Sequence, residues 1–152
     1  MLKICLCSDN HGDIDSINKI LSDNPACDYY FHCGDSLMPP EEIAPFISVE
    51  GNNDWRFDYP SQRIVEVGGH RILIFHGTRY VYSMKAMIEK ARLEEVDVVF
   101  FGHSHTFYDK THSNIRFINP GSTLYNRDLS KPSYARVYFL DDGNIRVERI
   151  DL

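Results

Sequence analysis

Several features that assign a chain to a membrane or secreted class are missing from this 152-residue sequence. No run of about eighteen apolar residues occurs, so no membrane-spanning helix is predicted. The first residues, MLKICLCSDNHGD, become polar too early for a secretory signal. No internal repeat, low-complexity segment or linker interrupts the chain. We therefore expect one domain over residues 1–152, located in the cytoplasm.

The sequence has four cysteines but no CxxC pair, which weakens both a disulfide framework and a zinc site. Cys5 and Cys7 alternate with Ile4 and Leu6 inside an apolar run. Free cysteine is among the most buried residue types. We interpret the thiols, Cys27 and Cys33 included, as structural groups in a reducing compartment.

An excess of basic residues is also missing, since the formal net charge is −6. Phosphate contacts in a nucleic-acid groove need clustered Lys and Arg, so the charge argues against nucleic acid as a partner. A small phosphate substrate remains compatible with this charge. Several carboxylates are candidate metal ligands, and two bound dications would reverse the local field.

The apolar runs predict short strands that alternate with helices early in the chain and dominate it later. A helix is expected to begin at the cap Asp13 and to end at Asn24-Pro25, and a second helix to begin at the cap Ser83. A short helix is expected in the Pro-rich loop near residue 40. Strands are expected at 2–8, 28–33, 47–50, 62–67, 70–75 and 96–102, with a final hairpin over 134–150. This order indicates an α/β or α+β sandwich.

Polar residues stand where each predicted buried strand ends, nearly always beside a glycine. The segments are SDNHG, HCGD, GNND, HG and GHSH. Ligands gather on loops that leave one end of such sheets, and glycine lets those loops turn sharply. If the ends converge, seven side chains surround one small volume: Asp9, His11, Asp35, Asn52, His76, His103 and His105.

Imidazole, carboxylate and amide oxygen together suit divalent Mn, Fe, Co, Ni or Zn. Seven protein ligands are too many for one such ion and fit two ions that share a bridging carboxylate. Two ions about 3.5–4 Å apart form the arrangement used for in-line displacement at phosphorus. No Ser-His-Asp signature or activated cysteine is visible. A metal-generated nucleophile accounts for that absence.

The ordered motifs D-x-H, G-D, G-N-x-D, H-G and G-H-x-H resemble the calcineurin-like metallophosphoesterase superfamily. The short length and the late Asn119-Pro120-Gly121-Ser122 resemble its small branch of YfcE-type phosphodiesterases. The resemblance runs from about residue 3 to about residue 135. It implies a four-layer β-sandwich flanked by helices and two divalent ions, with manganese favoured.

The resemblance also implies a role for each matching residue. Asp9, His11 and His105 are expected to hold the first ion, and Asp35 to bridge to the second. Asn52, His76 and His103 are expected to complete the coordination of the second ion, while Asp54 does not bind an ion but orients one of the ligands. A water or hydroxide bridging the ions would attack phosphorus.

Asn53 departs from the superfamily pattern, because many members carry a histidine there that protonates the leaving group. An amide cannot act as an acid. We therefore expect a phosphodiesterase that prefers small diesters with good leaving groups. Asn53 is expected to hydrogen-bond a phosphoryl oxygen, and Asn52 and His103 to take part in catalysis beside it.

Several alternatives stay open from the sequence. The Asn119–Ser122 turn walls the site or merely precedes the last strands, and Arg127 meets a phosphate or is solvated. Four aromatic residues line a pocket for an aromatic or nucleoside leaving group, or are core and surface residues: Trp55, Tyr80, Tyr82 and Tyr108. His32 is expected to be packed or hydrogen-bonded, and neither His70 nor His112, placed in a polar loop, is expected to be catalytic.

Three alternatives concern function itself. The fold also serves as a protein-interaction scaffold, as its resemblance to a subunit of the vacuolar-sorting retromer indicates, although such members usually lack some metal ligands. A phosphomonoesterase or nucleotidase of the same fold is the second alternative. A metal-storage or sensor protein is the third, which a buried site with room for a substrate disfavours. Homo-oligomer formation also stays open.

Overall fold

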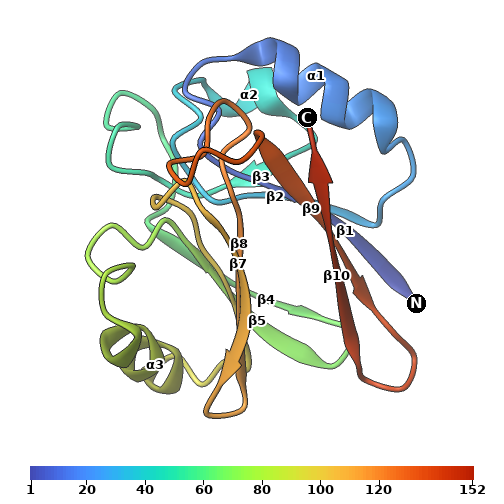
Figure 1. Cartoon of the computed structure of the whole chain (residues 1–152), viewed down its shortest axis with the longest axis vertical. Coiled ribbons are helices and arrows are strands. Elements are labelled where there is room, and N and C mark those ends of the chain that lie inside the picture. Colours follow the sequence, from blue (N-terminus) through green and yellow to red (C-terminus); the bar gives the residue numbers. More distant parts are fainter.

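Two five-stranded sheets, packed face to face, form the centre of the computed structural model, which describes residues 1–152 (Figure 1). The first sheet has the order β10-β9-β1-β2-β3 and the second the order β4-β5-β6-β8-β7. The first sheet contains β1 (Leu2–Cys7), β2 (Tyr29–His32), β3 (Ile47–Ser48), β9 (Ser133–Phe139) and β10 (Ile145–Asp151). The second contains β4 (Gln62–Val67), β5 (His70–Phe75), β6 (Val98–Phe100), β7 (Phe107–His112) and β8 (Ile115–Pro120).

Three helices cover the outer faces of the sheets: α1 (Ile14–Asp23), α2 (Pro40–Ile43) and α3 (Met84–Leu93). Figure 1 shows α1 and α2 over the first sheet and α3 over the second. One apolar cluster fills the space between the sheets, with Leu6 and Phe31 from one side and Ile74 and Phe100 from the other. Two further clusters lie under the helices. The predicted four-layer sandwich is confirmed.

The predicted helix boundaries are confirmed by their caps. The Asp13 side chain accepts a hydrogen bond from the amide of Asp15, and the Ser83 side chain accepts one from the amide of Ala86. Each satisfies an amide that has no partner within the helix. Helix α1 ends at Asp23, directly before the predicted Asn24-Pro25 stop.

The cysteines are structural, as predicted. All four are free thiols, and Cys5, Cys7 and Cys33 are buried. Burial raises the pKa of each of these three thiols above its usual range. A protonated buried thiol is neither a nucleophile nor a metal ligand.

One hairpin was not predicted from the sequence. Strands β7 and β8 pair in antiparallel register, from Phe107 opposite Pro120 to His112 opposite Ile115. His112 was expected in a polar loop, which is wrong: it ends β7, and its Nε2 lies 2.7 Å from the Tyr108 hydroxyl. The hairpin turns through Ser113 and Asn114, both with positive φ. Ser-Asn is a weaker turn signal than Asn-Gly, and β7 is rich in polar residues, so neither cue marked the strand.

Six strands run parallel to a neighbour: β1, β2 and β3 in the first sheet, and β5, β6 and β8 in the second. The carboxyl ends of these strands lead into the loops that carry the candidate ligands. No helix in the structure is long and apolar enough to cross a membrane.

Candidate metal centre

The loops that leave these parallel strands bring five of the seven predicted ligands into two overlapping groups. Asp9, His11 and His105 form one group, and Asp9, Asp35 and His76 form the other. Within each group, one ligand atom from every residue lies within 4.8 Å of the others. Asp9 follows β1, Asp35 follows β2, His76 follows β5 and His105 follows β6. Both sheets therefore contribute to one centre.

Two carboxylates lie between the histidines. Asp9 Oδ1 is 3.2 Å from His105 Nε2 and 3.7 Å from His76 Nε2, while Asp35 Oδ2 is 3.3 Å from His76 Nε2. His11 Nε2 is 3.7 Å from Asp9 Oδ1 and from Asp35 Oδ2. Asp9 belongs to both groups, so it shares the central position with Asp35, the residue expected to bridge.

The ring of His76 is oriented by the backbone. Its Nδ1 lies 2.7 Å from the carbonyl oxygen of Cys33, which only accepts hydrogen bonds. Nδ1 therefore carries the proton, and Nε2 faces Asp35 and Asp9. A ring nitrogen that faces carboxylate oxygens needs either a proton or a cation between them.

Asn52 and His103 flank this position on its open side. His103 Nδ1 lies 3.3 Å from His76 Nε2 and 3.2 Å from Asn52 Oδ1. Burial, with a smaller contribution from the charge of His76, lowers the pKa of His103. A neutral imidazole is the form that binds a metal ion.

The surroundings of Asp9 fit a cation. Its Oδ2 accepts hydrogen bonds from the Ser8 hydroxyl at 2.5 Å and from the His103 amide at 3.1 Å. Its Oδ1 is buried and has no hydrogen-bond partner. Burial opposes ionisation, but His105, His11 and Ser8 together hold the pKa of Asp9 well below its usual range. A buried carboxylate oxygen without a donor is costly unless a cation meets it.

Asn53 and Asp54 hold the loop that carries Asp35. The backbone N–H of Asn53 donates to Asp35 Oδ1, and the side-chain Nδ2 of Asn53 donates to Asp35 Oδ2, both at 2.9 Å. Asp54 accepts from the backbone amides of Asp35, Gly51 and Leu37. Asp54 thus positions Asp35 through the backbone, and Asn53 reaches a ligand carboxylate as well as the open side of the centre.

Backbone strain is concentrated in the ligand loops. Five of the predicted ligands are non-glycine residues with positive φ: Asp9 (59°), His11 (44°), Asp35 (59°), His103 (68°) and His105 (52°). This region is costly for residues with a Cβ, and such strain clusters at functional sites. Gly51 and Gly102 are needed for another reason, since a Cβ on either would overlap the carboxylate of Asp35 or Asp9.

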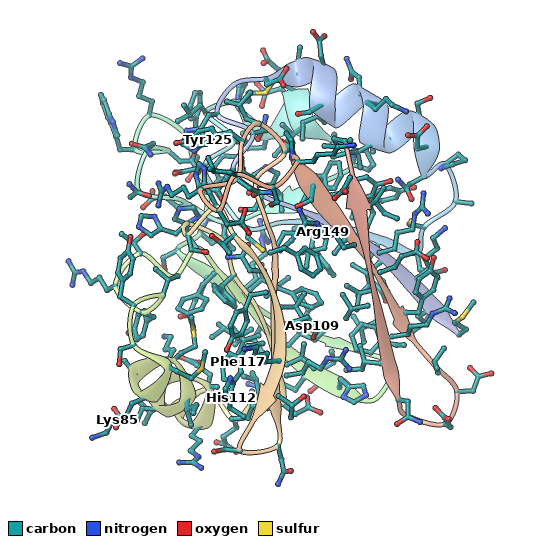
Figure 2. All side chains as sticks on the ribbon, viewed as in Figure 1. Lys85, Asp109, His112, Phe117, Tyr125 and Arg149 are labelled. Atoms are coloured by element: carbon teal, nitrogen blue, oxygen red, sulfur yellow. The ribbon has the colours of Figure 1, made fainter.

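The loop after β8 closes one side of the centre, which favours the first reading of the Asn119–Ser122 turn. Ser122 Oγ donates to the carbonyl oxygen of Asp9 at 2.8 Å, and Asn119 Nδ2 donates to that of Gly102 at 3.0 Å. The Arg127 amide donates to the carbonyl oxygen of His105. Figure 2 shows Tyr125 at the end of the molecule where this loop lies, with Lys85 and His112 at the opposite end.

The remaining histidines and aromatic residues separate by position. His32 is buried and hydrogen-bonded to Asn10, as predicted, and burial lowers its pKa to about 4. His70 lies against Asp97, away from the ligand groups. Tyr80 and Tyr108 pack beside the cluster under α3. Trp55 and Tyr82 are 73% and 78% exposed.

A metal centre built on strand-end loops of a two-sheet sandwich matches a known family. Residues 2–142 match the family model of the calcineurin-like phosphoesterase superfamily domain. A probable metallophosphoesterase of Bacillus subtilis, YsnB, is 31% identical over 147 residues, which cover 93% of this chain and 87% of that protein. The chain belongs to the calcineurin-like phosphoesterase superfamily and is a metal-dependent phosphoesterase.

Solved structures share the fold over almost the whole chain. A predicted phosphoesterase of Streptococcus pneumoniae has a TM-score of 0.89 and 28% identity, covering 99% of this chain and 89% of its own. A novel archaeal phosphodiesterase has a TM-score of 0.74 and 21% identity, covering 98% and 100%. Vps29 of Entamoeba histolytica, solved with zinc, has a TM-score of 0.72 and 20% identity, covering 99% of each chain. The last two show the fold alone.

Proposed function

We propose that this protein is a phosphodiesterase that holds two divalent metal ions at Asp9, His11, Asp35, Asn52, His76, His103 and His105. The observation that carries the proposal is the pair of ligand groups that share the buried, partnerless Oδ1 of Asp9. A carboxylate near both ligand groups would hold two ions close together. Asp9, which belongs to both groups, and Asp35, which lies beside His11 and His76, would serve in this way.

The chain's own residues prepare the centre for ions. Asp9 and Asp35 are held ionised, and the Cys33 carbonyl fixes the tautomer of His76 with Nε2 inward. Ser8 and the His103 amide occupy one oxygen of Asp9 and leave the other free. This arrangement leaves little to reorganise when ions bind.

The chemistry supplied by bound divalent ions is activation of a water molecule and neutralisation of phosphoryl charge. In the reaction, the oxygen of water bonds to phosphorus and the proton of that water passes to solvent, while the bond to one ester oxygen breaks and the leaving group departs as an anion, which only an acid could protonate as it leaves. The Asn53 amide is placed to donate a hydrogen bond to a phosphoryl oxygen beside Asp35, but cannot protonate the leaving group. Esters whose leaving group departs as a stable anion are therefore the preferred substrates.

A diester is favoured over a monoester by this lack of an acid. The archaeal phosphodiesterase of the same fold supports this choice.

The test compares an aryl phosphodiester with an aryl phosphomonoester in the presence of Mn²⁺, with bound metal measured by elemental analysis. We expect about two ions per chain and faster diester turnover. Asp35→Asn removes one charge at similar volume and is expected to lower metal affinity and turnover by about 100-fold. Asp142→Asn, in the exposed β9–β10 turn, is the matched control and should change neither.

The competing function is a protein-interaction scaffold of the same fold. It predicts a chain that binds no metal and hydrolyses neither ester with Mn²⁺, Ni²⁺, Co²⁺ or Zn²⁺. Every ligand position expected from the family is filled here, which favours the enzyme. Inactivity with all four metals would overturn our proposal.

A further inference from the structure

Three loops around the metal centre share one unusual feature: each carries an exposed aromatic ring and an arginine within three residues of it. The pairs are Trp55 with Arg56, Tyr82 with Arg79, and Tyr125 with Arg127. The exposed fractions of the three rings are 73%, 78% and 50%. The guanidinium groups of these three arginines form no ion pair and no hydrogen bond, whereas those of Arg116, Arg136 and Arg149 are paired with carboxylates.

Each of the three loops adjoins a candidate ligand. The centre of the Tyr82 ring lies 6.1 Å from the centre of the His103 ring, and the centre of the Tyr125 ring lies 4.7 Å from that of the His105 ring. Trp55 shares a cavity of about 370 Å³ with the ligand His11 and with Asn53. Its other lining residues are Leu37, Arg56 and Phe57.

The Trp55 loop combines the two kinds of contact most directly. The guanidinium carbon of Arg56 lies 4.9 Å from the centre of the indole ring, so charge and ring lie side by side. An exposed indole is costly to leave in water, and an unpaired guanidinium matches a phosphate oxygen. Rings alternating with cations are what bases and phosphates require of a protein surface.

We propose that the substrates are diesters of nucleotides, an inference that rests on the proposed phosphodiesterase activity. The cavity beside His11 receives a base, which stacks on Trp55, and the adjoining phosphate or ribose lies near Arg56. The cavity has room for about one base. The net charge of −6 disfavours a duplex, whose binding needs clustered Lys and Arg, and favours a small nucleotide diester.

Trp55 is the only tryptophan in the chain, which permits a direct binding test. Its fluorescence, excited where tyrosine does not absorb, is measured during titration of the metal-loaded protein with adenosine monophosphate. Ribose 5-phosphate, which has the phosphate and sugar but no base, is titrated as the control. We expect saturable quenching by the nucleotide alone. Equal behaviour of the two ligands would overturn the stacking proposal.

The kinetic test uses two diesters with the same leaving group: thymidine 5′-(p-nitrophenyl phosphate) and ethyl p-nitrophenyl phosphate. We expect kcat/KM to be about 5- to 100-fold higher for the nucleoside diester, the range that stacking of one base supplies. Trp55→Ala should abolish this preference, so that kcat/KM becomes equal for the two diesters. Leu93→Ala, at an 81% exposed position on α3, is the control for loss of an exposed apolar side chain.

Arg56→Ala is expected to raise KM for the nucleoside diester. Lys85→Ala is the charge control, because Lys85 lies at the end of the molecule opposite Tyr125 (Figure 2). The outcomes separate the two proposals. No turnover of either diester overturns the phosphodiesterase function itself. Turnover of both at equal kcat/KM, unchanged by Trp55→Ala, leaves that function standing and overturns the nucleotide specificity.

Discussion

At the scale of single residues, the buried polar side chains around the centre divide into those aimed at the ions and those that hold the loops. His32 is of the second kind. Gly34 donates its amide to His32 Nδ1 at 3.0 Å, so Nε2 carries the proton and donates to Asn10 Oδ1 at 2.9 Å. A neutral imidazole satisfies both contacts, and a protonated one would lose the first.

This arrangement predicts an acid-sensitive fold. The pKa of His32 is about 4 in the folded chain, against an ordinary value of 6.5, because the ring is buried. The unfolded chain therefore binds more protons between these values, and the free energy of unfolding falls as the pH decreases from 6.5 to 4. The full loss attributable to His32 is up to about 3 kcal/mol.

His32→Gln isolates this contribution, because glutamine does not titrate and its amide can still donate to Asn10. We expect the variant to be less stable at pH 7 but to lose less stability than the wild type on acidification. Urea unfolding at several pH values measures the difference. Parallel pH profiles for the two proteins would contradict the assignment of a neutral His32.

At the scale of elements, the centre depends on one loop bracing another. The loop after β8 presents Ser122, whose Oγ donates to the Asp9 carbonyl and accepts the amides of Leu124 and Tyr125. The hydroxyl thereby joins the end of β1, which carries two ligands, to the second sheet. Asp9 has positive φ, so its loop needs such support to keep the strained conformation.

We expect Ser122→Ala to lower the free energy of unfolding by about 1–3 kcal/mol, because a buried carbonyl and two amides lose a partner. Metal affinity should fall as well, because Asp9 loses its brace, and competition with a fluorescent chelator measures that loss. Ser130→Ala, whose hydroxyl contacts only Asp128 and Arg149 nearer the surface, is the control. An unchanged metal affinity in Ser122→Ala would show that the brace is dispensable.

The elements also show where sequence reasoning succeeds and where it stops. Caps such as Asp13 and Ser83 are local signals, and the structure has both. The β7–β8 hairpin was missed because β7 is stabilised by its partner strand and not by an apolar pattern of its own. Strand β3 was expected over 47–50, but only Ile47 and Ser48 pair with β2.

At the scale of the whole molecule, ligands from both sheets meet across the sandwich, so ion binding is coupled to the packing of the sheets. The order of motifs along the chain predicted which residues meet. It did not predict that Asp9 lies in both ligand groups, nor that Asn53 hydrogen-bonds Asp35, because both depend on three-dimensional distances. The aromatic and arginine pairs carry no motif and become visible only when the loops are placed together.

Metal binding should release protons. In the metal-free chain, Asp9 raises the pKa of His11, and Asp35 and Asp9 raise that of His76 although burial opposes this. Ions bind the neutral rings, so metal affinity decreases as the pH falls through these raised pKa values, which begins above the ordinary 6.5.

Calorimetric titration of the metal-free protein with Mn²⁺ measures this release, using buffers that differ in ionisation enthalpy. At neutral pH we expect the observed heat to vary linearly with the buffer enthalpy, and less so in Asp35→Asn, where one raising charge is missing. Heats that are independent of the buffer would contradict protonated histidines in the metal-free centre.

The position of β1 has a consequence for the order of events during synthesis. Of the strands described, β1 is made first, and it lies between β2 and β9, with Leu2 paired to Phe139. Until residues 133–139 emerge, one edge of β1 has no partner, and loop closure over almost the whole chain must precede that pairing. The loop that carries Asp9 and His11 is synthesised early, but it is not held in place until β9 has paired with β1. We therefore expect the nascent chain to bind its ions only after residues 133–139 have paired with β1.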